Sequence, residues 1–188
     1  MKVHEQIDDR MAAWIADQPM FFVGTAPAGS DGHINLSPKG LAGTFHIIDP
    51  LRVAYLDYTG SGAETTAHLR DNGRIVVMFC AFTGPPPIVR LHGHGRPIFP
   101  ADADFATLRA HFGRETDHAI RSIIDIELDR VTDSCGYTVP LMEFTGHRQL
   151  LDQWSARKTP EQLKQYWQQN NSVSIDGLPA IAGPAEFS

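Results

Sequence analysis

The segment from Val53 to Arg74, VAYLDYTGSGAETTAHLRDNGR, holds the residues best suited to chemistry in this chain. Its pattern predicts a strand, a glycine-broken turn over Thr59–Gly62 and a short helix over about 63–72. The first turn of a helix offers unpaired backbone N–H groups and the positive end of the helix dipole. The turn is therefore a candidate site for an anion such as a phosphate group.

The TGSG turn matches neither of the glycine motifs that bind nucleotide phosphates. No third glycine follows at the spacing of a dinucleotide-binding motif, and no Gly-Lys-Ser/Thr follows as in a Walker loop. A plain strand-to-helix turn with Ser61 as the helix cap explains the residues equally well. Glu64 complicates the anion site, because a carboxylate in the first turn complements the helix dipole itself and repels a phosphate.

Lys39 is a second candidate, placed where the pattern Ser37-Pro38-Lys39-Gly40 is expected to break a strand. It is either a plain surface lysine or a cation that reaches an anionic ligand across the mouth of a barrel.

A polar stripe follows one face of the strand expected over Ile88–Phe99. It consists of Arg90, His92, His94 and Arg96. A His-x-His pair can bind zinc, but no third ligand lies nearby in the sequence, so we expect no metal site. The stripe is either solvated or part of an interface, where its arginines could contact a phosphate or a partner subunit.

Short strands joined by turns are expected to position these residues. The strands are expected at residues 20–25, 33–37, 52–57, 75–80, 88–99, 120–131 and 139–144, and the helices at 4–17, 63–72, 101–112, 147–157 and 160–169. Residues 41–46 fit either a strand or a loop. About six to seven antiparallel strands predict a mainly β protein with flanking helices, closed into a small barrel.

We expect one domain over residues 1–188, in four parts. These are an N-terminal helix over 1–18, the barrel with inserted short helices over 20–144, C-terminal helices over 147–171 and an extended tail over 172–188.

Composition narrows the class of protein. A chain of 188 residues with 42% apolar residues can bury the core of one domain. A formal net charge of −6 argues against a nucleic-acid partner. Two cysteines make no disulfide framework, and the sequence shows neither a signal peptide nor a membrane-spanning stretch. We expect a soluble cytoplasmic protein with no nucleic-acid or membrane partner.

Together these segments resemble the pyridoxamine 5'-phosphate oxidase-like, FMN-binding split-barrel superfamily. The resemblance is carried by the strand 53–57, the TGSG turn, the helix end LRDNGR and the strand 75–79, with HINLSPKG before them and IVRLHGHGRPIF after them. CGYTVPLMEF and SIDGLPAI are similar to segments of an uncharacterised bacterial branch of that superfamily, distinct from the vitamin-synthesising oxidase.

The resemblance implies a split β-barrel that forms a homodimer, with FMN in a cleft between the subunits. It implicates the following residues in holding the flavin and its phosphate: Ser37, Lys39, Asp57, Tyr58, Thr59, Ser61, Glu64 and Thr65. In the oxidases two adjacent basic residues at the start of the helix grip the phosphate, and Glu64 and Thr65 occupy those positions here. A phosphate would then depend on backbone N–H groups, on Ser61 and Thr65, and on a more distant cation: Lys39, Arg70 or Arg96.

We therefore predict an FMN-binding protein, a flavin-dependent oxidoreductase that acts on a small molecule. Pyridoxamine phosphate oxidation itself is not expected, because the resemblance does not extend to the Arg-x-His element that closes the substrate site of the vitamin oxidases. The catalytic residue is unknown, and Tyr58, His94 and Cys135 are the candidates. Two alternatives remain: a binding module for a deazaflavin, haem or a small anion, and a cofactor-free interaction protein.

Overall fold

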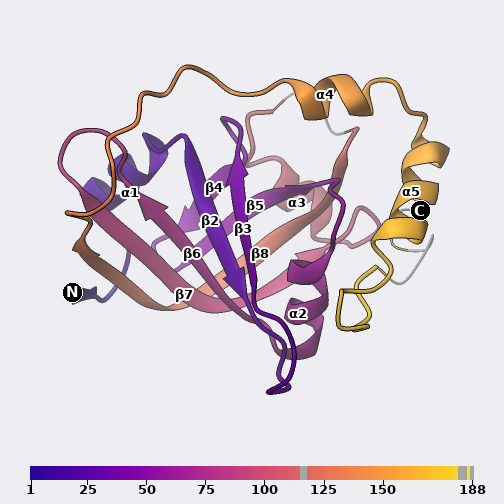
Figure 1. The fold of residues 1–188 in the computed structure, drawn as a ribbon, viewed down its shortest axis with the longest axis horizontal. Helices are drawn as coiled ribbons and strands as arrows, with labels where there is room; N and C mark the ends of the chain where they lie inside the picture. Colours follow the sequence, from indigo (N-terminus) through magenta and orange to yellow (C-terminus); the bar gives the residue numbers. More distant parts are fainter. Residues whose placement is uncertain (115–117, 182–185, 187–188) are drawn as a thin grey trace.

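A computed structural model describes residues 1–114, 118–181 and 186 of the chain (Figure 1). The described strands form one eight-stranded antiparallel sheet in the order β3-β2-β6-β7-β8-β5-β4, and β1 pairs with β8 outside this path. The strands are β1 Lys2–His4, β2 Met20–Thr25, β3 Asn35–Gly40, β4 Phe45–Asp49, β5 Arg52–Tyr58, β6 Arg74–Cys80, β7 Pro87–Ile98 and β8 Ile120–Cys135. The helices are α1 Asp9–Ala16, α2 Glu64–Asn72, α3 Phe105–Arg109, α4 Leu150–Ser155 and α5 Pro160–Asn170.

The sheet curls into a half-barrel whose two edge strands are β3 and β4 (Figure 1). β3 pairs only with β2, whereas β4 pairs only with β5. A gap without backbone pairing therefore separates β3 from β4, and also from the end of β5 around Asp57, which extends past its pairing with β4. We call this gap the split. This confirms the mainly β, single-domain barrel that the sequence predicts.

Long strands hold the curled sheet together. β8 pairs with β7 along the full length of β7, from Pro87 opposite Cys135 to Ile98 opposite Ile123. The register shifts between His92 and Gly93, where the two backbones approach closely. A Cβ atom at Gly93 would lie 2.0 Å from the carbonyl oxygen of Glu127, so only glycine fits this irregularity.

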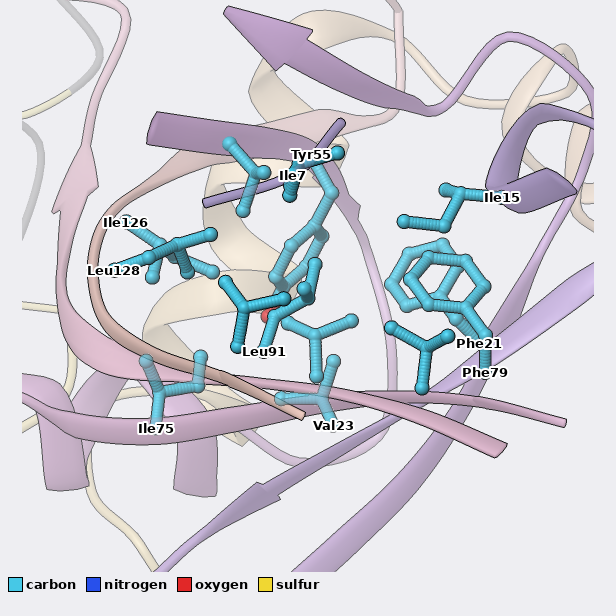
Figure 2. Close-up of a cluster of buried hydrophobic side chains, with 14 of the residues drawn as sticks. Ile7, Ile15, Phe21, Val23, Tyr55, Ile75, Phe79, Leu91, Ile126 and Leu128 are labelled. Carbon is cyan, nitrogen blue, oxygen red and sulfur yellow. The ribbon is translucent and has the colours of Figure 1, made fainter. Parts of the chain in front are cut away.

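Alternation along the strands sorts apolar side chains onto two faces. On the inner face, Val53 and Tyr55 of β5 join the main core, which α1 covers with Met11 and Ile15. Figure 2 shows part of this core, drawn from α1 and several strands. Alternate residues of β5 point the other way: Ala54, for example, packs with α3 in a second cluster.

The C-terminal part of the chain returns to α2. Trp167 of α5 is buried in a cluster with Phe99, and Ala180 packs against Ala63 and Ala67 at the start of α2. His33 lies near the tip of the β2–β3 hairpin and contacts Asp176, with 2.7 Å between His33 Nδ1 and Asp176 Oδ1. Residues 172–181 of the expected tail therefore cover α2, the helix that follows the TGSG turn. The rest of the expected tail lies largely outside the described residues.

Several predicted elements have different bounds in the structure, and one is absent from it. Residues 139–144 were expected to form a strand, but they lie in an irregular segment between β8 and α4 (Figure 1). The helix expected from residue 4 begins only at Asp9, because Asp8 caps it by accepting the Met11 N–H at 2.7 Å. Residues 2–4 form strand β1 instead.

β3 was expected to break at Pro38-Lys39-Gly40, but it continues to Gly40. The proline is tolerated because β3 is an edge strand, where one side needs no N–H for pairing. This longer strand carries Lys39 to the split. Among the described residues, no helix combines the length and the apolar character needed to cross a membrane.

Candidate functional site

Polar side chains from β3, β5 and α2 meet across the split, and we call them the split cluster. On β3, Asn35, Ser37 and Lys39 lie opposite Thr25, Val23 and Phe21 of β2. Alternate residues of a strand share one face, so these three side chains lie on the inner side with the core residues of β2. Asp57 meets them from β5 and Thr65 from α2.

Asp57 is the centre of the cluster and is only 1% exposed. Lys39 Nζ donates to its Oδ1 at 3.0 Å, and Arg121 donates to its Oδ2 from Nε at 3.0 Å and from Nη2 at 2.8 Å. Burial on its own raises the pKa of Asp57, but the charges of Arg121 and Lys39 outweigh it, so the pKa lies below its ordinary value. Two cations thus share one ionised carboxylate.

Arg121 links this cluster to the TGSG turn. Its Nη1 donates to the carbonyl oxygen of Gly62 at 2.9 Å. Sequence reasoning missed this residue and named Lys39, Arg70 or Arg96 as possible cations, of which Lys39 lies in the cluster. Arg70 instead pairs with Glu186, and Arg96 pairs with Asp104 and Asp125.

The signal for Arg121 lies in strand pairing. β8 runs antiparallel to β5 and places Ser122 opposite Asp57 and Ile120 opposite Tyr58. A register shift lies between these two pairs, and Arg121 is the residue between their β8 partners. Its side chain is thereby brought beside Asp57.

A chain of hydrogen bonds extends the cluster under α2. Ser37 Oγ donates to Asn35 Oδ1 at 2.9 Å, and Asn35 Nδ2 donates to the hydroxyls of Thr25 and Thr65, each at 3.1 Å. Thr25 Oγ1 lies 3.0 Å from Nδ1 of His68, which is fully buried. Burial lowers the pKa of His68, so the imidazole is neutral near neutral pH.

Three buried polar atoms in this region have no hydrogen-bond partner among the described residues. They are Tyr55 Oη, Thr66 Oγ1 and His68 Nε2. Buried polar groups are normally paired, so such atoms mark places where water or a ligand group completes the hydrogen bonding.

The N-terminus of α2 has no side-chain cap. The N-cap residue is Ala63, and the expected cap by Ser61 is wrong. The first intrahelical bond runs from the Ala67 N–H to the Ala63 carbonyl at 3.0 Å, so the N–H groups of residues 64–66 precede it. Glu64 folds back toward the turn: its Oε2 lies 2.3 Å from where a Cβ of Gly62 would be.

The remaining predicted residues have other surroundings. Thr59 Oγ1 donates to the Ala119 carbonyl at 3.0 Å and accepts from Trp167 Nε1 at 2.8 Å, so the fold already uses this hydroxyl. Tyr58 lies on the opposite face of β5 from Asp57, with the Arg114 guanidinium 5.4 Å from its ring.

The other two catalytic candidates lie outside the split cluster. His94 faces Asp129, with 3.4 Å between Nδ1 and Oδ2, and Cys135 is exposed at the end of β8.

The structure thus brings Ser37, Lys39, Asp57 and Thr65 together. Ser61 and Glu64 lie at the adjoining turn, with Ser61 exposed. The described residues enclose hollows that include one of about 830 Å³ and one of about 550 Å³, and Thr59–Gly62 line neither of these.

Comparison with known proteins identifies the family. Residues 7–135 match the family model for pyridoxamine 5'-phosphate oxidase, which is more than half of the chain. The chain belongs to the pyridoxamine 5'-phosphate oxidase family. The "Pyridoxamine 5'-phosphate oxidase family protein ustO" of Aspergillus flavus is 38% identical over 192 residues, covering 95% of this chain and 77% of the relative.

Solved structures of similar proteins agree on the fold of this family member. HupZ from Group A Streptococcus is 20% identical, with a TM-score of 0.52 over 68% of this chain and 99% of that one. A candidate 5-nitroimidazole antibiotic resistance protein from Bacteroides thetaiotaomicron is 12% identical, with a TM-score of 0.50 over 70% of this chain and 85% of that one. At such low identity these structures support the fold alone.

Proposed function

We propose that this member of the family binds FMN at the split cluster and acts as a flavin-dependent oxidoreductase on a small molecule. The observation that carries the proposal is the charge arrangement at α2. Lys39 and Arg121 share the single carboxylate of Asp57, and Arg121 also contacts Gly62 immediately before an uncapped helix N-terminus. Two cations thus lie with one buried carboxylate beside the backbone N–H groups of residues 64–66, an arrangement that favours an anion, although the Glu64 carboxylate at the same turn offsets the excess positive charge.

The residues present fit a phosphate-bearing cofactor. The N–H groups of residues 64–66 and the exposed Ser61 hydroxyl would hold the phosphate, with Arg121 as the nearby cation. The unpartnered Tyr55 hydroxyl offers a further polar contact within the cluster. Glu64 opposes this fit, because its carboxylate lies at the same turn.

A bound flavin would supply hydride and electron transfer, and the chain would bind, orient and shield it. Asp57 stays ionised because its pKa is lowered, so it holds Lys39 and Arg121 in place at the wall of the site. The substrate would be a small molecule, and we expect one other than pyridoxamine phosphate.

The proposal includes a homodimer with the cofactor between subunits. The outer face of the sheet near the split carries exposed Ile34 and Leu36, which are 80% and 68% exposed, next to the half-buried Val76. Apolar side chains gathered on one face are typical of an interaction surface. A second copy covering this face would bring a second subunit to the split.

FMN titration followed by flavin fluorescence tests the function, with riboflavin as the ligand without a phosphate. FMN should bind more tightly than riboflavin. Glu64→Lys should lower the dissociation constant for FMN about tenfold or more and leave riboflavin unchanged, because it replaces a repulsive charge by a charge-assisted hydrogen bond. Glu161→Lys makes the same charge change in the first turn of α5 and should leave both constants unchanged.

No FMN binding at concentrations of about tens of micromolar would overturn the proposal. Binding of a deazaflavin or haem in its place would support the binding-module alternative. Sedimentation should show a dimer, and a monomer at every concentration would contradict the shared site.

A further inference from the structure

A large hollow lies at the α1 side of the half-barrel. Its volume is about 830 Å³, within the range of small-molecule sites. Its walls are α1, the β3–β4 connection, the β6–β7 connection and the irregular segment before α4. Asp57, Arg121 and the TGSG turn do not line it, so the hollow is separate from the proposed flavin site.

Aromatic side chains from separate elements meet at the floor of this hollow. The Phe45 ring lies 5.2 Å from Phe21 and 5.0 Å from Phe79 between centroids, the latter in an edge-to-face arrangement. Phe21 and Phe79 are buried, whereas Phe45 is only half-buried. Aromatic surface is therefore left uncovered in the interior of the hollow.

The walls add further aromatic and flexible side chains. Trp14 of α1 and Phe82 of the β6–β7 connection are half-buried. Met142 and Phe144 are 53% and 54% exposed and form the outer wall. This outer segment has no regular structure, and the Met142 N–H donates to the Phe82 carbonyl at 3.0 Å.

The β3–β4 connection at the rim is held in a strained conformation. Leu41 has φ of 74° and is the one non-glycine residue with a positive φ in the described part of the chain. Thr44 Oγ1 contacts the carbonyl oxygens of Gly40 and Leu41, each at 2.9 Å, and so fixes the bend. Strain of this kind persists where the surroundings enforce it, and it clusters at ligand sites.

The charges around the hollow favour no ion. Three carboxylates line it, but Asp133 pairs with His4 at 2.8 Å and Asp8 is engaged as the cap of α1. Asp17 is the remaining carboxylate, and Lys2 and Arg10 are the cations of the lining. The lining therefore carries no large net charge of either sign.

We propose that this hollow binds an uncharged, planar aromatic molecule. Such a ligand would stack on the open surface of Phe45, with Trp14 and Phe82 at its sides and Phe144 over it, because aromatic rings prefer offset or edge-to-face contacts with one another. The site does not depend on flavin, since it shares no residue with the split cluster or with Arg121.

Equilibrium dialysis with indole, quantified by chromatography, tests the site. Indole should bind saturably at one site per chain. Phe144→Ala should weaken binding about five- to tenfold, as expected for the loss of one ring contact. Tyr137→Ala is the matched control, because Tyr137 is another exposed aromatic residue of the C-terminal half, 84% exposed, that does not line the hollow. This control should bind indole as the wild type does.

Charged analogues test the chemical class. Tryptamine and indoleacetate carry opposite charges on the same ring system, and both should bind more weakly than indole. Tighter binding of either would overturn the assignment of an uncharged ligand.

Two other outcomes would overturn the site itself. One is that indole shows no saturable binding up to about 1 mM. The other is that Phe144→Ala and Tyr137→Ala change the dissociation constant for indole equally. A Phe144→Ala variant that loses self-association while indole has no effect would assign the hollow to a second copy of the chain. Met142→Ala repeats the test if Phe144→Ala unfolds. The dialysis is run with and without FMN, so indole binding is measured independently of whether the chain binds flavin.

Discussion

Lys39 on β3 and Asp57 on β5 join the two sides of the split, with 3.0 Å between Nζ and Oδ1. Arg121 of β8 holds the other carboxylate oxygen, so the buried acid is enclosed between two cations. A buried carboxylate is costly unless it is paired in this way. The ion pair therefore bridges a gap that backbone hydrogen bonds leave open.

Replacing Lys39 by Met should lower the free energy of unfolding by about 1–3 kcal/mol, because Asp57 loses one of its charged donors. Urea unfolding measures the change. Lys2→Met, at an exposed position, should change it by less than about 0.5 kcal/mol. Equal losses in the two variants would show that the pair does not hold the split together.

The lowered pKa of Asp57 predicts a specific response to acid. The folded chain binds this proton more weakly than the unfolded chain does. The stability that Asp57 provides is therefore present above the unfolded pKa of about 3.9 and is lost as pH falls through the folded value. Urea midpoints between about pH 7 and pH 3 should fall less steeply in Asp57→Asn than in the wild type.

Asp9→Asn removes an exposed carboxylate from the first turn of α1 and should keep the wild-type slope. An unchanged slope in Asp57→Asn would mean that Asp57 is not ionised in the folded chain. If that variant is too unstable to measure, NMR titration of the Asp57 carboxyl carbon in the wild type gives the same answer.

As pH is lowered, His68 should reduce the free energy of unfolding at a higher pH than Asp57 does. Burial lowers the pKa of this imidazole, so the unfolded chain binds its proton first. Stability is then full above the unfolded pKa of about 6.5 and declines as pH falls below it. His68→Gln should flatten urea midpoints between about pH 7 and pH 5, because glutamine can still accept from Thr25 but does not titrate.

The exposed His118, whose Nε2 lies 2.6 Å from the Lys158 carbonyl oxygen, offers the matched change His118→Gln. This variant should retain the pH dependence of the wild type. A His68→Gln variant that also retains it would contradict a buried neutral imidazole.

Gly93→Ala should destabilise the sheet by more than about 3 kcal/mol, since the new methyl group would collide with the backbone of Glu127 and force β7 from β8. Thermal unfolding measures this. Gly113→Ala adds the same atom where nothing lies within 4 Å and should be nearly neutral. A mild effect at Gly93 would show that the strands can separate at this register shift.

Local patterns in the sequence predict most of the sheet. β2 is found at the predicted residues, and the alternation of β8 correctly indicates a strand, because both signals depend on neighbouring residues only. The strand expected over 139–144 fails for the same reason: its apolar residues fit a strand, but no neighbouring strand pairs with them. β1 is too short to give a pattern.

The site is harder to predict, because its residues meet only after strands pair. Lys39 was singled out from the sequence pattern around it, and Ser37, Asp57 and Thr65 through the family resemblance; the structure shows that all four are close together. Arg121 was missed, since its partner Asp57 lies 64 residues earlier in the chain. Their use as cofactor ligands remains a prediction.

Trp167 and Asn171 donate to Thr59 and Gly60 from 108 and 111 residues downstream. A polypeptide released before α5 is made could complete its sheet, but these two groups would still lack their donors. The glycine bend therefore gains these two contacts only when the end of the chain docks. Substitutions in α5, remote in sequence and touching no ligand, should alter what that bend can hold.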